Sequence, residues 1–280
     1  LGLTPVLVDV LPDTFNIDPD AIEKAITPNT KAIVPVHLFG QVADMDRIMD
    51  IAQKHNLFVI EDNAQGIGAT HTDAAGTKVK TGGIGHVGST SFFPSKNLGC
   101  YGDGGAILTN DDDLAHTIRG VVNHGMYKRY HHDVVGVNSR LDSLQAVVLN
   151  EKLKLLDFYN ERRKWAAIRY SQLLQDHPKI ETPVTSGDCD SHVYHQYTLK
   201  IVGADRDALV QHLQQNDIPC GVYYPIPLHL QKAYVDTRYK EADFTVTNQL
   251  IDEVVSLPMH SELDEDQIQF ICKTILAFLD

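Results

Sequence analysis

One lysine, Lys96, stands in a turn whose surroundings favour covalent chemistry. The turn follows a strand-like run at residues 89–93 and precedes a second apolar run at residues 106–108. Apolar and aromatic residues flank the lysine, and the first acidic residue after it is Asp103. Such surroundings disfavour the ammonium form, so the pKa of the amine falls and the neutral amine becomes a nucleophile. The turn predicts a lysine that forms an imine with a carbonyl carbon, and an ordinary surface lysine is the alternative.

A carboxylate upstream supplies a second group for the same chemistry. Asp62 follows a predicted strand at residues 57–60, and ligands of parallel α/β sheets bind beyond the carboxyl ends of the strands. A lysine and a strand-end carboxylate suit pyridoxal phosphate, whose aldehyde takes an amine and whose ring nitrogen stays protonated beside a carboxylate. The hydroxyl groups of Ser89, Thr90 and Ser91 offer hydrogen bonds to its phosphate.

Alternating strands and helices position these groups. Strands are predicted at residues 5–10, 31–36 and 57–60, and helices capped by Asp18 and Asp44 alternate with them. This order predicts a parallel sheet covered by helices. Further predicted elements are a hairpin or surface excursion within residues 70–85, a helix at 111–122, a long loop at 123–140, a helix over 141–175, a strand at 197–201, a helix at 205–216, a strand near Val222 and a last helix at 264–279.

The composition narrows the class of protein. The chain has 280 residues and a net charge of −13, which argues against nucleic acid or an anionic membrane as a partner. There is no run of membrane length and no signal peptide, so we expect a cytoplasmic protein. Neither an HExxH motif nor a CxxC pair occurs, so we expect no metal site and reduced thiols at Cys100, Cys189, Cys220 and Cys272.

Several motifs together resemble one family. They are PVHLFGQVADMD at 35–46, EDNAQGIGA at 61–69, TSFFPSKNLGCYGDGGAILTND at 90–111, YHHDVVGVNSRLDSLQAVVL at 130–149, YYPIPLHLQ at 223–231 and SLPMH at 256–260. Jointly they resemble the DegT/DnrJ/EryC1/StrS family of pyridoxal-phosphate-dependent aminotransferases, which act on keto-sugars linked to nucleotides. The motifs span nearly the whole chain, so their joint pattern is specific although each alone is weak.

The resemblance implies roles for five residues. Lys96 matches the Schiff-base lysine that also moves a proton between cofactor and substrate, and Asp62 matches the carboxylate that pairs with the ring nitrogen. Gln65 matches the residue beside the ring and its phenolic oxygen, and Ser91 matches a phosphate-binding hydroxyl. Asn138 matches the asparagine that reaches the phosphate from the partner subunit. The alternatives are a helix cap for Asp62, an exposed strand hydroxyl for Ser91, and turn residues for Gln65 and Asn138.

Substrate contacts are expected mainly from histidines and from the long loop. Candidates for contact with the sugar or nucleotide are His37, His132 and His229, with structural or interface histidines as the alternative. Because the chain is acidic overall, a diphosphate needs local cations. Lys128, Arg129 and Arg140 are the candidates for that role.

The resemblance also implies an architecture. It is fold type I of pyridoxal phosphate enzymes (aspartate-aminotransferase-like), with a large, mostly parallel sheet domain at residues 1–155. A bridging helix and a smaller α+β domain follow at residues 156–280. The family normally carries an upstream phosphate-binding turn, so we expect the N-terminal part of the fold to be missing.

The implied reaction is transamination of a nucleotide-linked keto-sugar, with glutamate as amino donor, in amino-sugar biosynthesis for surface glycans. The active form implied is a homodimer with shared active sites. A sugar dehydratase is one alternative, but family members with that activity replace the lysine by histidine, and Lys96 is present. Two further functions stay open, namely a non-catalytic relative with a binding or regulatory role and a truncated, inactive fragment of the aminotransferase.

Overall fold

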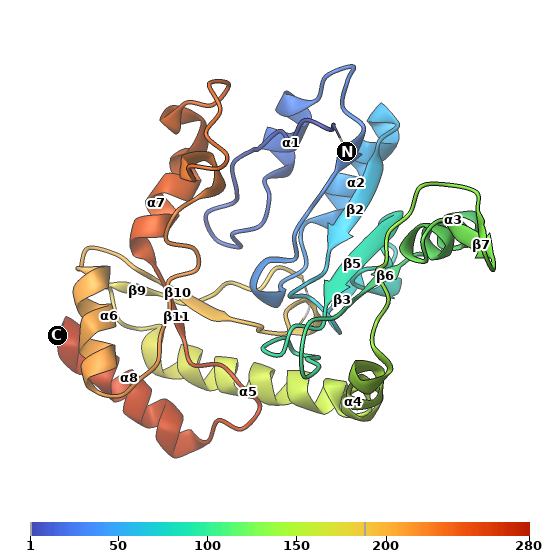
Figure 1. Ribbon diagram of the computed structural model, residues 1–280. Helices are drawn as coiled ribbons and strands as arrows, with labels where there is room; N and C mark the ends of the chain where they lie inside the picture. The colour runs from blue at the N-terminus through green and yellow to red at the C-terminus, as the bar shows by residue number, and fades with distance from the viewer. Residues whose placement is uncertain (1, 188) are drawn as a thin grey trace.

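Two separate sheets form the framework of the computed structural model, which describes residues 2–187 and 189–280. The larger sheet has the strand order β1-β2-β5-β6 and the smaller one the order β11-β10-β9. Helices lie around both sheets, and helix α5 (Leu156–Leu174) runs along the base of the molecule between α8 and α4 (Figure 1). The predicted α/β architecture is therefore present.

The four-stranded sheet brings the predicted site residues to one edge. It contains β1 (Ala32–Ile33), β2 (Phe58–Asp62), β5 (Val87–Ser91) and β6 (Gly105–Leu108). The first three strands are parallel and β6 is antiparallel to β5, so the sheet is mixed. Asp62 and Ser91 are the last residues of the neighbouring parallel strands β2 and β5. Parallel strands end at the same edge, so both residues lie where ligands of such sheets bind.

Helices α1 (Pro19–Ala25) and α2 (Met45–His55) pack on this sheet through a shared apolar core. The side chains of Asp18 and Asp44 accept hydrogen bonds from the first turns of these helices, as predicted for N-caps. The buried residues of this core are Ile22, Ile33, Val42, Ala43, Met45, Ile48, Ile51, Ala52, Leu57, Val59, Ala69 and Val193. They follow the helical and strand periods that the sequence shows.

The second sheet is antiparallel and has its own core. It contains β9 (Ile180–Glu181), β10 (Tyr197–Ile201) and β11 (Val254–Leu257). Helices α5, α6 (Arg206–Gln215) and α8 (Glu265–Leu279) cover it, and α8 begins with a capping box at Asp264 and Gln267. The largest fully buried side chains here are Tyr170, Tyr197, Leu174, Leu199, Ile201, Leu209, Leu213, Ile268 and Ile275.

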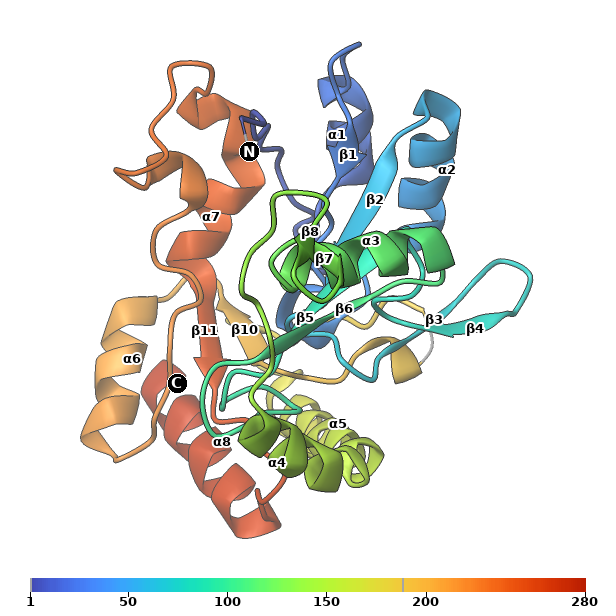
Figure 2. The same cartoon turned by 45° about the vertical axis from the view of Figure 1, so that its right-hand side comes forward.

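Smaller elements complete the fold. Helix α3 (Asp112–Val122) lies in front of the larger sheet with the β7–β8 hairpin beside it (Figure 2). The other elements are β3 (Thr70–Thr72), β4 (Lys78–Lys80), β7 (Met126–Lys128), β8 (His131–His132), α4 (Ser143–Leu153), α7 (Thr245–Glu253) and four 3₁₀ turns at Leu38–Gly40, Cys189–Ser191, Leu228–Leu230 and Glu241–Phe244. The predicted hairpin within residues 70–85 is confirmed as β3 and β4.

Three sequence-based expectations about elements were wrong. Residues 5–10 form no strand, because Asp9 instead accepts hydrogen bonds from the first turn of α7, at the backbone N–H groups of Val246 and Thr247. The predicted helix over residues 141–175 is two helices, which break between Leu153 and Leu156. Near residue 222 only one bridge forms, between Gly221 and Ser256. At residues 5–10 a tertiary contact therefore overrides a local apolar pattern.

The part of the chain that the structure describes contains neither a membrane-spanning helix nor a cluster of metal ligands. None of its helices has the length and apolar character needed to cross a membrane. Cys100, Cys220 and Cys272 are free, whereas the side chain of Cys189 lies outside the described part. Within residues 2–187 and 189–280, no three His, Cys, Asp or Glu side chains are grouped so as to hold a metal ion.

Candidate active site

Asp62 is fixed by backbone contacts on both sides of the sheet edge. Its N–H donates to the carbonyl oxygen of Pro35 at 2.8 Å, which extends the pairing between β1 and β2. Its carboxylate Oδ1 accepts a hydrogen bond from the N–H of Ala64 at 3.0 Å. This bond shapes the turn after the strand, and residues 63–69 form no helix that Asp62 could cap. The side chain is half-buried.

The turn that carries Lys96 is closed by hydrogen bonds at several points. The N–H of Cys100 donates to Phe92 O at 2.8 Å, and the N–H of Lys96 donates to Phe93 O at 2.9 Å. A Cβ at Gly99 would lie 2.4 Å from Pro94 O, so this close approach needs glycine. From α4, Lys152 Nζ donates to Gly99 O at 2.7 Å. The lysine therefore stands on a rigid turn.

Burial and charge act on Lys96 in opposite directions. The side chain is half-buried, and burial lowers the pKa of its amine because the ammonium form loses hydration. The negative charge of Asp62 opposes this and raises the pKa, but burial prevails. The two groups are therefore close enough to interact electrostatically, and the neutral amine of Lys96 is favoured relative to an ordinary lysine.

Gln65 is held by a hydrogen bond at each end of its amide. Its Oε1 accepts from the N–H of Phe39 at 2.6 Å, and its Nε2 donates to the Tyr224 hydroxyl at 3.2 Å. The side chain is buried. This amide thus links the turn after Asp62 to the Pro-rich loop near the second sheet, and sequence reasoning had not assigned Tyr224 to the site.

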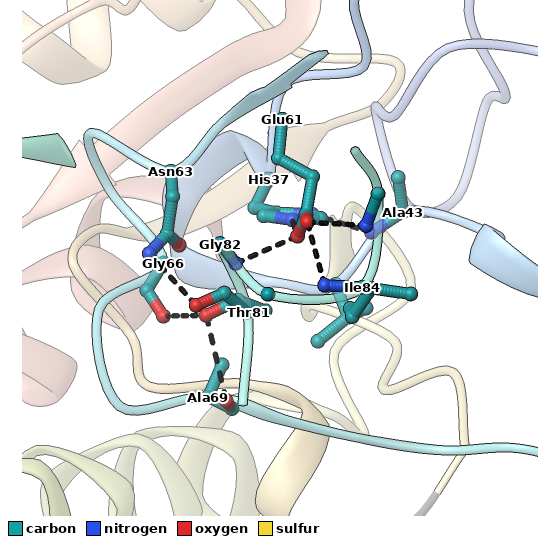
Figure 3. A network of polar contacts seen from close by, with 12 residues as sticks. His37, Ala43, Glu61, Asn63, Gly66, Ala69, Thr81, Gly82 and Ile84 are labelled. Atoms are coloured by element: carbon teal, nitrogen blue, oxygen red, sulfur yellow. Dashed lines mark hydrogen bonds and ion pairs between the residues drawn. The ribbon is translucent and has the colours of Figure 1, made fainter. Parts of the chain in front are cut away.

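A buried network of polar contacts around Glu61 and His37 lies next to the turn that follows Asp62 (Figure 3). Glu61 Oε2 accepts from Gly82 N at 2.6 Å and lies 2.9 Å from His37 Nε2, while Oε1 accepts from Ile84 N at 2.8 Å and Gly85 N at 2.7 Å. His37 Nδ1 accepts from Ala43 N at 3.2 Å. Desolvation raises the pKa of Glu61, but these hydrogen bonds outweigh it and hold the pKa below its ordinary value. Glu61 is therefore a buried anion directly beside Asp62.

His37 does not fit the role of substrate contact that the sequence suggested. Its side chain is fully buried, and both ring nitrogens are engaged, with Glu61 and with the backbone of Ala43. From the sequence alone, a histidine at a strand end that contacts a ligand cannot be distinguished from one that contacts a buried carboxylate. The acidic neighbour, Glu61, was visible in the sequence and is its partner.

The hydroxyl groups near the end of β5 divide by their contacts. Ser89 and Thr90 donate to the backbone oxygens of Glu61 and Asn63. Ser91 Oγ instead accepts from the N–H of Phe93 at 3.2 Å. Within the described residues the Ser91 hydroxyl hydrogen has no acceptor, so Ser91 is the hydroxyl of the three that remains able to donate to a ligand.

The residues predicted on the long loop lie apart from this edge. Those named are Lys128, Arg129, His132, Asn138 and Arg140, all exposed. Their contacts are local: Arg140 Nε donates to Asn138 Oδ1 at 3.1 Å, and His132 Nδ1 lies 2.9 Å from His124 O. Within the described residues no hydrogen bond or ion pair joins them to Asp62, Gln65 or Lys96, so the structure of this chain does not bring the two sets together.

His229 lies in a different environment from His37. It is buried, its ring stacks on Phe244 with centroids 4.1 Å apart, and its Nε2 has no hydrogen-bond partner among the described residues. It lines a largely apolar cavity of about 510 Å³ together with Phe39, Tyr223 and Tyr224. Tyr224 in turn contacts Gln65, so this cavity adjoins the turn after Asp62.

The donor set at this edge fits pyridoxal phosphate. It offers a carboxylate, an amine of lowered pKa, a rigid amide and a hydroxyl with a hydrogen to donate, at Asp62, Lys96, Gln65 and Ser91. A lysine of lowered pKa together with a carboxylate for the ring nitrogen, on an α/β fold, is typical of one class, the pyridoxal phosphate enzymes of the aminotransferase type.

Comparison with known proteins specifies that class further. Residues 1–276 match the DegT/DnrJ/EryC1/StrS aminotransferase family, and this chain belongs to that family. It is 46% identical to UDP-2-acetamido-2-deoxy-3-oxo-D-glucuronate aminotransferase of Pseudomonas aeruginosa, over 98% of this chain and 73% of that protein. It is 45% identical to a "pleiotropic regulatory protein" of Geobacillus stearothermophilus, over 99% of this chain and 73% of that one.

Solved structures agree with this assignment. A DegT/DnrJ/EryC1/StrS aminotransferase from Brucella abortus superimposes with a TM-score of 0.92 at 40% identity, over 99% of this chain and 74% of that chain. NtdA from Bacillus subtilis, solved with bound cofactor PMP, gives 0.88 at 33% identity, over 99% and 62%. This chain is thus an aminotransferase whose cofactor is pyridoxal phosphate. The alignments cover nearly all of this chain but only 74% and 62% of those two chains, so the expectation that an N-terminal part of the fold is missing stays untested.

Proposed function

We propose that this chain transfers an amino group from an amino acid, glutamate in the family's manner, to the ketone of a nucleotide-linked sugar. The product would serve amino-sugar biosynthesis for surface glycans, in the cytoplasm. The observation that carries the proposal is Lys96, a half-buried amine of lowered pKa whose charge interacts with Asp62. The name of the Pseudomonas relative supports a uridine diphosphate sugar as the substrate class.

Lys96 has two tasks in this proposal. Its Nζ would hold the cofactor by a covalent bond and, once released, would move a proton between two carbon atoms as general base and acid. A lowered pKa suits both tasks, because the amine must be neutral to accept the proton. The rigid turn keeps Nζ in place while the amino acid and the sugar alternate as substrates.

Three further side chains would bind the cofactor. Pyridoxal phosphate supplies an electron sink when its ring nitrogen is protonated. Asp62 would keep that proton in place by charge pairing, and Gln65, fixed by Phe39 and Tyr224, would pack beside the ring. Ser91 would donate its hydroxyl hydrogen to the phosphate, and its contact with Phe93 N leaves that hydrogen available.

Substrate binding is assigned to two surfaces. His229 and Tyr224 line the cavity of about 510 Å³, which is large enough for a sugar ring. The exposed cations Lys128, Arg129 and Arg140 would meet the diphosphate, and His132 on the same segment would contact the sugar or nucleotide.

A homodimer with shared active sites explains how the long loop would reach a site. Several large apolar side chains are exposed on this loop, on α4 and on the Lys96 turn, including Tyr101, Tyr130, Val135, Leu144 and Val147. An exposed apolar surface of this extent favours association with another protein surface. In the proposed dimer Asn138 would bind the phosphate of the partner's cofactor.

The proposal includes two domains. Residues 1–155 would form the cofactor domain, and residues 156–280 the bridging helix with the smaller α+β domain. The separate apolar cores around α2 and around α8 support this division. Val193, which packs in the first core, is a contact across the proposed boundary.

A visible absorption titration tests the reaction. Addition of pyridoxal phosphate should produce the band of the lysine-bound cofactor, and glutamate should convert it to the spectrum of the aminated cofactor. Lys96→Ala should abolish the band, while Lys24→Ala, at an exposed lysine on α1, is the matched control and should retain it. A band that does not respond to any amino acid would contradict transamination.

A regulatory role is the second candidate function, and the name of the Geobacillus relative is the observation that favours it. It predicts cofactor or ligand binding without turnover. Single-turnover amination of a nucleotide-linked keto-sugar by the aminated protein would exclude a purely regulatory role.

A further inference from the structure

Three buried polar side chains behind Lys96 form a continuous hydrogen-bonded chain. His195 Nδ1 lies 3.1 Å from Asn97 Oδ1, and Asn97 Nδ2 donates to Asn160 Oδ1 at 2.8 Å. Asn97 Nδ2 also donates to the carbonyl oxygen of Val193 at 3.1 Å. Buried amides with this many partners have one orientation, so the network fixes each member. Asn97 directly follows Lys96 in the chain.

The protonation state of His195 is defined by its partners. Because Asn97 Nδ2 is the donor in two bonds, Asn97 Oδ1 is the acceptor and His195 Nδ1 must carry the hydrogen. Burial, together with the charges of Lys96 and Arg163, lowers the pKa of His195 to about 3. The ring is thus neutral at physiological pH and its Nδ1–H remains a donor to Asn97.

Asn160 joins the two loops that carry the proposed cofactor ligands. Its Oδ1 holds the Lys96 turn through Asn97, and its Nδ2 donates to the carbonyl oxygen of Ile67 at 3.2 Å, in the loop after Asp62. At Gly68 φ is +90° and a Cβ would lie 2.4 Å from Asn160 Nδ2. Glycine at this position lets the loop approach the amide so closely.

The same helix also holds the other end of the network. Arg163, three residues after Asn160 on α5, donates from Nη1 to the carbonyl oxygens of Tyr194, His195 and Met259, at 3.1, 3.3 and 3.1 Å. One face of α5 therefore fixes the Lys96 turn, the loop after Asp62 and the segment that leads into β10.

We propose that Asn97, Asn160 and His195 are positioning residues that hold Lys96 at a fixed separation from Asp62. The inference rests on the proposed function, because it assigns these residues to the same site. The physical reason is that Lys96 and Asp62 adjoin two different loops, and Asn160 is hydrogen-bonded to each loop, through Asn97 in one and Ile67 in the other. A lysine that must alternate between a covalent bond and proton transfer gains from a turn that does not move.

The test measures Lys96 itself in the full chain without cofactor. Competitive acetylation with acetic anhydride across a pH series, read by mass spectrometry of the peptide that contains Lys96, gives the pKa of its amine. Asn160→Ala leaves Lys96 and both of its neighbours in place. Loosening of the turn should admit water and raise the pKa of Lys96 by about 0.5 or more.

His195→Phe tests the other end of the network and serves if Asn160→Ala fails to fold. It retains a ring but removes the donor to Asn97 Oδ1, and it should shift the pKa of Lys96 in the same direction. Ser256→Ala is the matched control, because it removes a buried 2.8 Å hydrogen bond to Thr198 in the smaller sheet. It should lower the unfolding temperature without moving the pKa of Lys96.

Two results would be distinct failures. Variants of the network that lose stability like Ser256→Ala, with an unchanged pKa for Lys96, would show a merely structural role and overturn the inference. An ordinary lysine pKa for Lys96 in the unsubstituted chain would instead count against the proposed function.

Discussion

The loops that carry Asp62 and Lys96 differ from the segment at residues 123–140 in how far their polar groups are already paired. Around the first region, the Glu61 carboxylate, the Gln65 amide and the Asn97 amide each have two or more partners within the chain. In the second, the charged side chains are exposed and their hydrogen bonds join close neighbours, as between Arg140 and Asn138.

This difference implies that the two regions lose different amounts of side-chain freedom when a ligand binds. A paired and buried network holds its geometry before a ligand arrives, so binding there costs little ordering of side chains. Exposed arginine and lysine side chains lose rotamer freedom when they bind, at about 0.5–1.5 kcal/mol for each. We therefore expect the cofactor site to tolerate few substitutions and the loop to tolerate many.

The largest effect should come from Asp62→Asn in the paired region. The amide keeps the shape but cannot stabilise a protonated ring nitrogen by charge, so kcat should fall by about 100-fold or more. Single-turnover rates with glutamate measure this directly. Asp252→Asn, an exposed position on α7, is the matched control. A rate for Asp62→Asn equal to that of the control would remove Asp62 from the proposed mechanism.

Glu61→Gln tests whether the buried anion beside Asp62 stabilises the fold. The neutral amide replaces one oxygen acceptor by a donor, so backbone N–H groups of residues 82–85 lose partners and about 2–3 kcal/mol of unfolding free energy should be lost. Denaturant unfolding at neutral pH gives this quantity. Glu151→Gln, on an exposed side chain of α4, should leave it unchanged.

The pH dependence gives the same network a second test. The pKa of Glu61 in the fold lies below its ordinary value of 4.5, so the unfolded chain binds the proton more readily. The contribution of Glu61 is therefore complete above about pH 4.5 and is lost as the pH falls through its folded-state pKa. Glu61→Gln should lack this acid-dependent part. Parallel stability curves for the two proteins would show that Glu61 is not held as an anion.

Leu144→Asp moves the test to the unpaired region. Leu144 is 81% exposed, and Val147 on the same helix and Tyr101 on the Lys96 turn are also exposed. If this surface forms the proposed dimer, a buried aspartate should weaken association by about 10- to 100-fold, measured by sedimentation velocity. Phe270→Asp, an exposed apolar position on α8, should leave the assembly state unchanged. Equal sedimentation of both variants would place the interface elsewhere.

The contrast between the two regions also shows which features a sequence reveals. Periodicity and caps predicted α1, α2, α3 and α8 because each depends on contacts within a few residues. Lys96 and Asp62 were found because their spacing from strand ends is local. The loss of a strand at residues 5–10 depends on a distant partner, because Asp9 accepts a hydrogen bond from the N–H of Thr247.

Long-range pairing also explains the site residues that the sequence left unassigned. Asn160 and His195 lie 63 and 98 residues from Asn97, and no local pattern relates them. The partners of His37 and Gln65 are also distant in the sequence: Glu61 lies 24 residues from His37, and Tyr224 lies 159 residues from Gln65. A motif names the residue types at a site, whereas only the fold shows which of them pair with one another.

The smallest effect is expected from charge reversal on the exposed loop. Lys128→Glu with Arg129→Glu places two negative charges where the proposed dimer would bind a diphosphate, and UDP affinity should fall by about 3- to 10-fold because exposed charges act through solvent. The control variant, Lys24→Glu with Lys273→Glu, changes the net charge by the same amount at exposed positions on α1 and α8. Isothermal titration calorimetry at two salt concentrations separates the local effect from the effect of net charge. If the loop cations contact the diphosphate, UDP affinity should fall only in the Lys128/Arg129 variant, and the affinity of that variant should depend less on salt. Equal affinities for both variants would show that the loop cations do not meet the diphosphate.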